Sequence, residues 1–203
     1  MSNPKSTSLS FKVMDKSVAY KDFFKVNRFV FEYDTFSGER MTNVVREVFM
    51  RGSAVGVLLV DKIQRQVIFV EQFRAGAAAA DAQNPWLVEL VAGIVEPGES
   101  PEDVAMRESD EEAGCKPINL IPMHHYWVSP GGTDEDVYLF CGLVDSTQAV
   151  DFGGLDHEHE DIKVHKLSFD KAYNRLKEGR LNNAMTIIGV QWLMLNESHL
   201  ERF

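Results

Sequence analysis

The segment that most constrains this chain runs from Gly93 to Cys115 and reads GIVEPGESPEDVAMRESDEEAGC. Its second half predicts a helix over 101–113, because Ser100 is a favoured N-cap residue, Pro101 is favoured at the first helical position, and Gly114 is a common C-terminal stop. This helix ends in ESDEEAG, so carboxylates crowd its last turns. Negative charge there opposes the helix dipole and costs about 0.3–1 kcal/mol per group.

These carboxylates lie mostly on one face of the predicted helix. At about 100° per residue, Glu108, Glu111 and Glu112 share a face, while Asp110 points to the other side. Glu108 and Glu112 repel each other at the i,i+4 spacing, whereas Arg107 can pair with Glu111. A charge run is commonly only a solvated surface, but a divalent cation would remove both penalties. Hard cations such as Mg²⁺ prefer oxygen ligands and leave room for phosphates, so the pattern predicts a metal platform.

The composition limits the possible partners and location. A net charge of −10 argues against nucleic acid or an anionic membrane as the main partner. The longest apolar run, 55–60, is too short to span a bilayer, and the polar start MSNPKSTSLS does not match a signal peptide. Two cysteines, Cys115 and Cys141, are therefore expected to be free thiols in the cytoplasm.

Runs of apolar residues between turn signals predict the remaining elements. Three strands are expected in a small N-terminal antiparallel β unit, at 18–20, 29–33 and 44–49. Further strands are expected at 54–60 and 66–71, as a hairpin, and at 86–95, 120–128, 137–143 and 161–167. Residues 75–84 read as a loop or short helix, 151–161 as a loop, and 169–178 and 183–196 as helices, the last with an apolar face that includes Leu195.

This order of elements predicts an α/β (α+β) fold in which a mixed sheet lies between helices. We expect two domains, an N-terminal β unit over 1–50 and a catalytic domain over 51–203.

The acidic segment resembles the signature of Nudix hydrolases, G-x5-E-x7-R-E-U-x-E-E-x-G-U, in which U is a bulky aliphatic residue. Every fixed position is present: Gly93, Glu99, Arg107, Glu108, Glu111, Glu112 and Gly114. The two U positions hold Ser109 and Cys115, which we expect to weaken the packing beneath the helix. The resemblance implies the Nudix α/β/α sandwich and a metal site, but it says little about the substrate.

The flanking segments resemble bacterial ADP-ribose pyrophosphatases. The resemblance is carried by 71–74 (EQFR), by 89–93 (ELVAG), by Pro130 in SPGGT, by 158–161 (EHED), and by the N-terminal β unit. It implies Mg²⁺-dependent hydrolysis of the diphosphate bond of ADP-ribose to AMP and ribose 5-phosphate, with Mn²⁺ as a possible substitute. It also implies a homodimer in which the N-terminal β unit is exchanged between subunits.

The same resemblance implies a role for each site residue. The Ala92 carbonyl, Glu108, Glu112 and Glu160 would bind metal, with Glu111 close to the same ions as a catalytic residue, and Glu158 would be the general base. Adenine would stack on Phe23 and Phe24 of the other subunit. The ribose and diphosphate would be held by Arg46, Glu47, Arg51 and Arg74, and the terminal ribose by Ser129, Pro130, Gly131 and Glu135.

Several alternatives remain open from the sequence. Phe23 and Phe24 could belong to the core, Arg51 and Arg74 could be surface charges, and Glu135 could be a solvated loop residue. Glu160 could replace Glu158 as the base. A zinc site at His157, His159 and His165 is disfavoured, because the oxygen ligands on the helix favour Mg²⁺ or Mn²⁺.

Two other functions compete with ADP-ribose hydrolysis. One is cleavage of another nucleoside diphosphate derivative: a sugar nucleotide, NADH or a dinucleoside polyphosphate. The other is a nucleotide sensor without catalysis, which the intact glutamates of the signature argue against.

Overall fold

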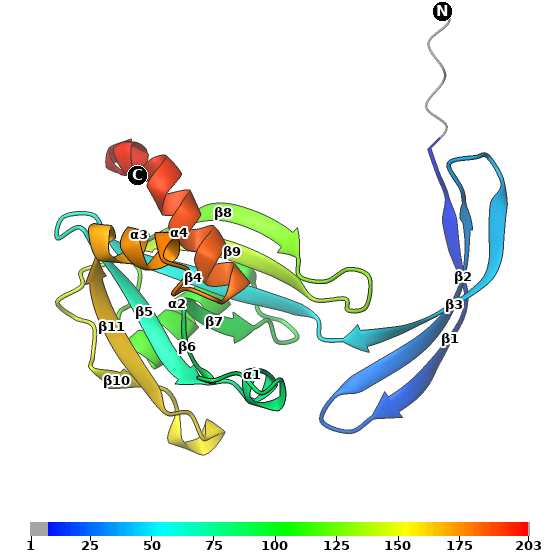
Figure 1. Cartoon of the computed structure of the whole chain (residues 1–203), viewed down its shortest axis with the longest axis horizontal. Helices are drawn as coiled ribbons and strands as arrows, with labels where there is room; N and C mark the ends of the chain where they lie inside the picture. Colours follow the sequence, from blue (N-terminus) through cyan, green and yellow to red (C-terminus); the bar gives the residue numbers. More distant parts are fainter. Residues whose placement is uncertain (1–7, 203) are drawn as a thin grey trace, which may run out of the picture. The chain divides into compact units, whose positions relative to one another are not determined.

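The computed structural model describes residues 8–202, and the chain divides into two compact units. The first unit contains the described residues up to Gly52 together with Trp127–Glu135, and the second contains the rest. The elements of both units are labelled in Figure 1. No helix in the described range is both long enough and apolar enough to cross a membrane.

The first unit is a three-stranded antiparallel sheet in the order β1-β2-β3, formed by Phe11–Lys21, Lys25–Asp34 and Arg40–Met50. All three predicted strands are present, and each is longer than predicted. The loop 127–135 binds the end of β3, where the Phe49 N–H donates to the Gly132 carbonyl (2.9 Å) and the Arg51 N–H to the Asp134 carboxylate (2.6 Å). This loop and β3 therefore form one body.

The second unit contains an eight-stranded sheet with the order β10-β11-β5-β4-β9-β8, to which β6 adds on β5 and β7 on β4. The β4 and β9 strands are parallel, while β4 pairs antiparallel with β5 and β7, so the sheet is mixed. The bounds are β4 Ser53–Asp61, β5 Gln66–Phe73, β6 Trp86–Glu89, β7 Val91–Ile94, β8 Asn119–Trp127, β9 Asp136–Leu143, β10 Phe152–Gly153 and β11 Ile162–Ser168.

Helices cover both faces of this sheet (Figure 1). Alternate residues of β4 point to opposite faces, as the period of a strand requires. On one face, Val55, Val57 and Leu59 pack with Val104 and Ala105 of α2 (Pro101–Ala113). On the other, Leu58 and Val60 pack in a cluster with α3 (Phe169–Lys177) and α4 (Ala184–Asn196), through Phe169, Val190 and Leu193. The predicted α/β/α sandwich with a mixed sheet is confirmed.

The two unusual residues of the signature, Ser109 and Cys115, are both buried. The Ser109 hydroxyl donates to the Ala105 carbonyl one turn earlier (2.6 Å), so its polar atom is satisfied inside the core. Cys115 joins the cluster beneath α2.

The predicted single strand over 86–95 is wrong, because the structure has two strands that meet at Leu90. Before Leu90 the chain pairs with β5, and after it with β4. The Leu90 N–H instead donates to the Thr186 hydroxyl of α4 (3.2 Å). A continuous apolar run carries no sign of such a change of partner, since both halves are buried.

Smaller differences concern the loops and the last helix. The 75–84 segment contains the short helix α1 (Ala75–Ala79), and the late loop contains β10 and the 3₁₀ turn η1 (Asp156–Glu158). Leu195, placed on the apolar face of the last helix, is 79% exposed. The chain ends in a second 3₁₀ segment, η2 (Glu197–Arg202).

Candidate functional site

The acidic end of α2 is fixed in register by caps at both helix ends. At the N-terminus, the Ser100 hydroxyl accepts from the Asp103 N–H (3.2 Å), and the Asp103 carboxylate accepts from the Ser100 N–H (3.3 Å). At the C-terminus, Gly114 adopts the left-handed conformation with φ of 59°. Both predicted ends of the helix are confirmed, so its last turns present the signature glutamates as expected.

Strand β7 lies directly against this helix face. A Cβ atom on Gly93 would come within 2.0 Å of a Glu108 carboxylate oxygen, so only glycine lets the carboxylate lie so close to the strand. One residue earlier, the Ala92 N–H donates to Glu112 Oε2 (3.1 Å). Two glutamates of α2 are therefore held against the backbone of β7.

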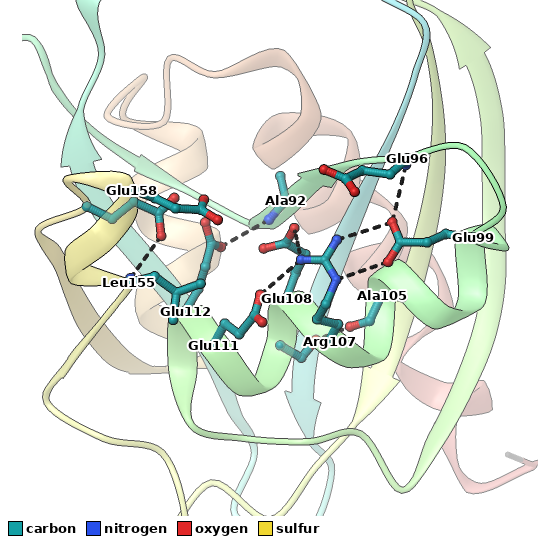
Figure 2. A network of polar contacts seen from close by, with 12 residues as sticks. Ala92, Glu96, Glu99, Ala105, Arg107, Glu108, Glu111, Glu112, Leu155 and Glu158 are labelled. Carbon is teal, nitrogen blue, oxygen red and sulfur yellow. Dashed lines mark hydrogen bonds and ion pairs between the residues drawn. The ribbon is translucent and has the colours of Figure 1, made fainter.

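Arg107 gathers the other carboxylates around one guanidinium group (Figure 2). Its Nη1 donates to Glu108 (2.8 Å) and to Glu111 (2.9 Å), which confirms the predicted pair at the i,i+4 spacing. Its Nε donates to Glu99, the acidic residue before the helix (3.1 Å). Hydrogen bonding to Glu99 raises the pKa of Arg107 further above its ordinary value, and the side chain stays charged.

Burial disfavours the charged form of two of the glutamates on α2, Glu112 and Glu108. Glu112 is only 2% exposed, and burial raises its pKa to about 8. Burial likewise raises the pKa of Glu108 to about 6. The negative charge of Glu160 raises both pKa values further, so Glu160 lies within electrostatic range of these two glutamates.

The late loop reaches this site because it packs on the C-terminal end of α2. The Gly154 N–H donates to the Glu111 carbonyl (2.9 Å), and a Cβ on Gly153 would lie 2.0 Å from the Glu112 carbonyl oxygen. Within the loop, the Glu160 carboxylate accepts from the Leu155 N–H (3.2 Å). Glu158, seen near this site in Figure 2, has a side chain that is 56% exposed.

These residues fit a divalent cation. Across residues 8–202, no three His, Cys, Asp or Glu side chains already converge as a complete metal site. However, the donors at α2 are all oxygens, two of them have pKa values raised by burial, and their mutual repulsion calls for added positive charge. Of the histidines considered as zinc ligands, His165 instead pairs with Glu71 across β11 and β5 (2.7 Å).

The residues assigned to substrate lie on both units. Arg74 belongs to the second unit, with the acidic helix and the late loop, whereas the other nine belong to the first unit. Among those nine, Phe23 is 92% exposed and Phe24 45% exposed, so neither lies in a core of the described chain. Arg46, Glu47, Ser129, Pro130 and Gly131 are also exposed.

A small aromatic and charged cluster in the first unit contains three of these nine residues, Phe24, Arg51 and Glu135, together with Phe49. The Arg51 guanidinium lies over the rings of Phe24 and Phe49, 5.7 Å from each centroid. Arg51 also pairs with Glu135 at 3.6 Å. The two rings meet edge to face, with centroids 5.1 Å apart. Arg51 is therefore already oriented within its own unit.

Sequence reasoning assigned no role to three polar residues that contact the site. Gln72, which is 7% exposed, donates to the second oxygen of Glu112 (3.4 Å). Glu89, which is 5% exposed, accepts from Arg74 and from Asn183. For Gln72 and Glu89 the available signal was a polar residue inside an otherwise apolar strand, since such residues are rarely buried without a specific partner.

Comparison with known proteins identifies the family. The chain belongs to the NUDIX domain family, whose model matches residues 50–185. An ADP-ribose pyrophosphatase of Haemophilus influenzae is 44% identical and covers 94% of this chain and 89% of its own length. The enzyme of the same name from Escherichia coli K12 is 40% identical over 94% of this chain and 90% of its own length.

More distant relatives extend this picture. A GDP-mannose pyrophosphatase of Yersinia pestis is 30% identical, with 87% of each chain covered. A solved structure described as an ADP compounds hydrolase superposes with a TM-score of 0.71 over 95% of this chain and 97% of that one, at 16% identity. This structural likeness supports the same fold.

The raised pKa of Glu112 predicts a pH-dependent stability of the metal-free protein. Its ordinary pKa is 4.5, and its pKa in the folded chain is about 8. The folded state therefore binds more protons than the unfolded state between these values, and stability falls as the pH rises through this window. Glu112→Gln removes this titration and should stabilise the metal-free protein at pH 8 by about 1–4 kcal/mol.

Urea unfolding in a chelator at several pH values measures this effect. Glu102→Gln, which changes an exposed residue of the same helix, is the matched control. Its free energy of unfolding should change with pH as that of the wild type does. If the free energy of unfolding of the wild type and of Glu112→Gln changed with pH in the same way, the raised pKa of a buried carboxyl group at this position would be contradicted.

Proposed function

We propose that this protein hydrolyses the diphosphate bond of ADP-ribose and releases AMP and ribose 5-phosphate, with Mg²⁺ as its metal and Mn²⁺ as a substitute. The NUDIX domain and the relatives named ADP-ribose pyrophosphatase support this activity. The observation that carries the proposal is the set of crowded, partly buried carboxylates at the end of α2. An anionic substrate can approach such a set only when cations neutralise both partners.

The residues that would hold the metal are the Ala92 carbonyl, Glu108, Glu112 and Glu160. Bound there, a divalent metal supplies positive charge for the diphosphate, lowers the pKa of a water, and stabilises charge in the displacement transition state. Glu111 shares Arg107 with Glu108, which keeps its carboxylate beside these ligands as a catalytic residue.

Glu158 is proposed to take the proton of the attacking water. Its carboxylate is largely exposed, while that of Glu160 is tied to the Leu155 N–H. A general base needs a carboxylate that can reach water, whereas a metal ligand gains from being fixed in place. This contrast supports the division of roles between the two glutamates.

Substrate binding is proposed to combine the residues of both units. Adenine would stack on Phe23 and Phe24, whose rings are exposed. Arg46, Glu47, Arg51 and Arg74 would hold the ribose and diphosphate, because the guanidinium fork binds phosphate oxygens in pairs. Ser129, Pro130, Gly131 and Glu135 would line the end of the site that takes the terminal ribose.

We also propose a cytoplasmic homodimer in which residues 1–50 are exchanged between subunits, so that Phe23 and Phe24 act in the partner's site. Support comes from the large apolar side chains that β1 exposes, among them Phe11 (71%), Val18 (57%) and Tyr20 (55%). Exposed apolar faces of this kind mark interaction surfaces. The free thiols of Cys115 and Cys141 fit a reducing compartment.

A panel of substrates tests the activity. The pure protein with Mg²⁺ is incubated with ADP-ribose, GDP-mannose, NADH and a dinucleoside polyphosphate, and the products are separated by chromatography. We expect kcat/KM for ADP-ribose to be at least roughly tenfold higher than for the others, because the site holds both ends of this substrate. A preference for GDP-mannose would instead place the chain with its sugar-nucleotide relatives, and no cleavage of any of them would favour a sensor.

Two isosteric changes test the division of roles in the late loop. Glu158→Gln should lower kcat by about 10²–10⁴-fold, because the proton acceptor is lost, and added Mg²⁺ should not restore it. Glu160→Gln should raise the Mg²⁺ concentration needed for activity and recover at high Mg²⁺. Near-normal turnover of Glu158→Gln together with collapse of Glu160→Gln would reverse the two roles.

Subunit mixing tests the exchanged dimer. One protomer carries Phe23→Ala and Phe24→Ala, and the other carries Glu112→Gln, so each homodimer is defective. If the N-terminal unit serves the partner's site, each mixed dimer contains one intact site, and an equal mixture should regain about a quarter of wild-type activity. No gain on mixing, with dimers confirmed by sedimentation, would show that each site is built from one chain.

A further inference from the structure

A buried hydrogen-bonded network of Arg74, Glu89 and Asn183 lies beside the proposed metal site and joins β5, β6 and α4. Arg74, which follows β5, donates through Nε to Glu89 Oε2 at 2.6 Å. Glu89 is the last residue of β6, and its side chain is 6% exposed. Its other oxygen, Oε1, accepts from Asn183 Nδ2 at 2.6 Å. Both oxygens of a buried carboxylate are therefore occupied by side chains from two other elements.

This arrangement fixes one edge of the Arg74 guanidinium and leaves the other edge available. Arginine has five N–H groups, and the bond to Glu89 uses the one on Nε. Within the described range, no protein acceptor bonds the Nη1 or Nη2 groups, and the Arg74 side chain is 40% exposed. The main chain is anchored as well, since the Arg74 N–H donates to the Pro85 carbonyl (2.9 Å).

The guanidinium also lies within electrostatic range of the acidic helix. Burial is the main cause that raises the pKa of Glu112, and the positive charge of Arg74 counteracts it. Gln72, two residues before Arg74, donates to Glu112 (3.4 Å), so this part of the chain lies beside the acidic helix.

We infer that Glu89 and Asn183 are positioning residues, which hold Arg74 by its Nε edge so that its two terminal nitrogens present a fixed fork to the diphosphate of the substrate. The inference rests on the proposed function only in that the substrate contains a diphosphate. An arginine whose fork is already oriented loses less freedom when phosphate binds.

Asn183 suits this task because it has a donor and an acceptor on one short side chain. It is the N-cap of α4, and its Oδ1 accepts from the Thr186 N–H (3.1 Å), while its Nδ2 donates to Glu89. Aspartate could cap the helix equally well, but it would place a second carboxylate against Glu89. The start of α4 is thereby coupled to the orientation of Arg74.

A double-mutant cycle on the full chain tests the inference, with KM and kcat measured for ADP-ribose. Arg74→Lys loses the planar fork and should raise KM by roughly 10- to 100-fold. Glu89→Gln should raise KM by roughly tenfold, because the charge that orients the fork is gone. If Glu89 acts only through Arg74, the double variant should have the KM of Arg74→Lys alone.

Two further variants separate positioning from stability. Asn183→Asp keeps a good N-cap but repels Glu89, so KM should rise while the helix stays intact. Ser146→Ala is the control, because it removes a buried hydroxyl that donates to Asp61 (2.7 Å), away from Arg74, Glu89 and Asn183. It should lower the melting temperature and leave KM unchanged.

Either of two results with the variants would overturn the inference. The first is a Glu89→Gln variant with unchanged KM and a lowered melting temperature, as in the control. The second is a double variant whose KM increase equals the product of the single increases. If the wild type prefers another substrate of the panel, the double-mutant cycle is run with that diphosphate. An incorrect ADP-ribose assignment is then distinguished from an incorrect role for Glu89 and Asn183. A wild type that cleaves no diphosphate overturns both.

Discussion

The structure of the site depends on the close approach of α2 to β7, which concentrates carboxylates where a helix least favours them. Gly93 makes this approach possible, since any side chain there would meet Glu108. Arg107 offsets part of the charge by binding Glu99, Glu108 and Glu111 together. Glu112 receives no ion pair within 8–202 and is nearly inaccessible to water. The remaining negative charge is what makes a divalent cation the natural partner of this face.

The rest of the second unit supports this face from several directions. The capping box starts α2 in the correct register, the glycines of the late loop let Glu160 approach, and the junction of β6 with α4 orients Arg74. The proposed metal ligands and the proposed phosphate ligand, Arg74, thus come from separate elements of one sandwich. Within the first unit, exposed aromatic rings and an oriented arginine have the chemistry that binds a base and a phosphate.

Much of the fold could be predicted from the sequence because local signals were strong. The bounds of α2 follow from Ser100, Pro101 and Gly114, and the alternation of β4 follows from its two buried faces. The break at Leu90 could not be predicted, because it depends on a hydrogen bond to Thr186, far along the chain. For the same reason, the signature revealed Glu108 and Glu112 but not Gln72, Glu89 or Asn183. Their roles arise from tertiary contacts and have no fixed spacing.

The central claim is that the α2 carboxylates form a divalent-cation site that is protonated in part when empty. Isothermal titration of the substrate-free protein with Mg²⁺ near pH 7, in two buffers of different ionisation enthalpy, tests it directly. We expect saturable binding that releases protons, because the pKa of Glu112 is raised to about 8 and metal ligands bind deprotonated. Glu112→Gln should weaken the binding and reduce the proton release. Equal Mg²⁺ affinity in wild type and in the variant, with no proton released by either, would contradict the account.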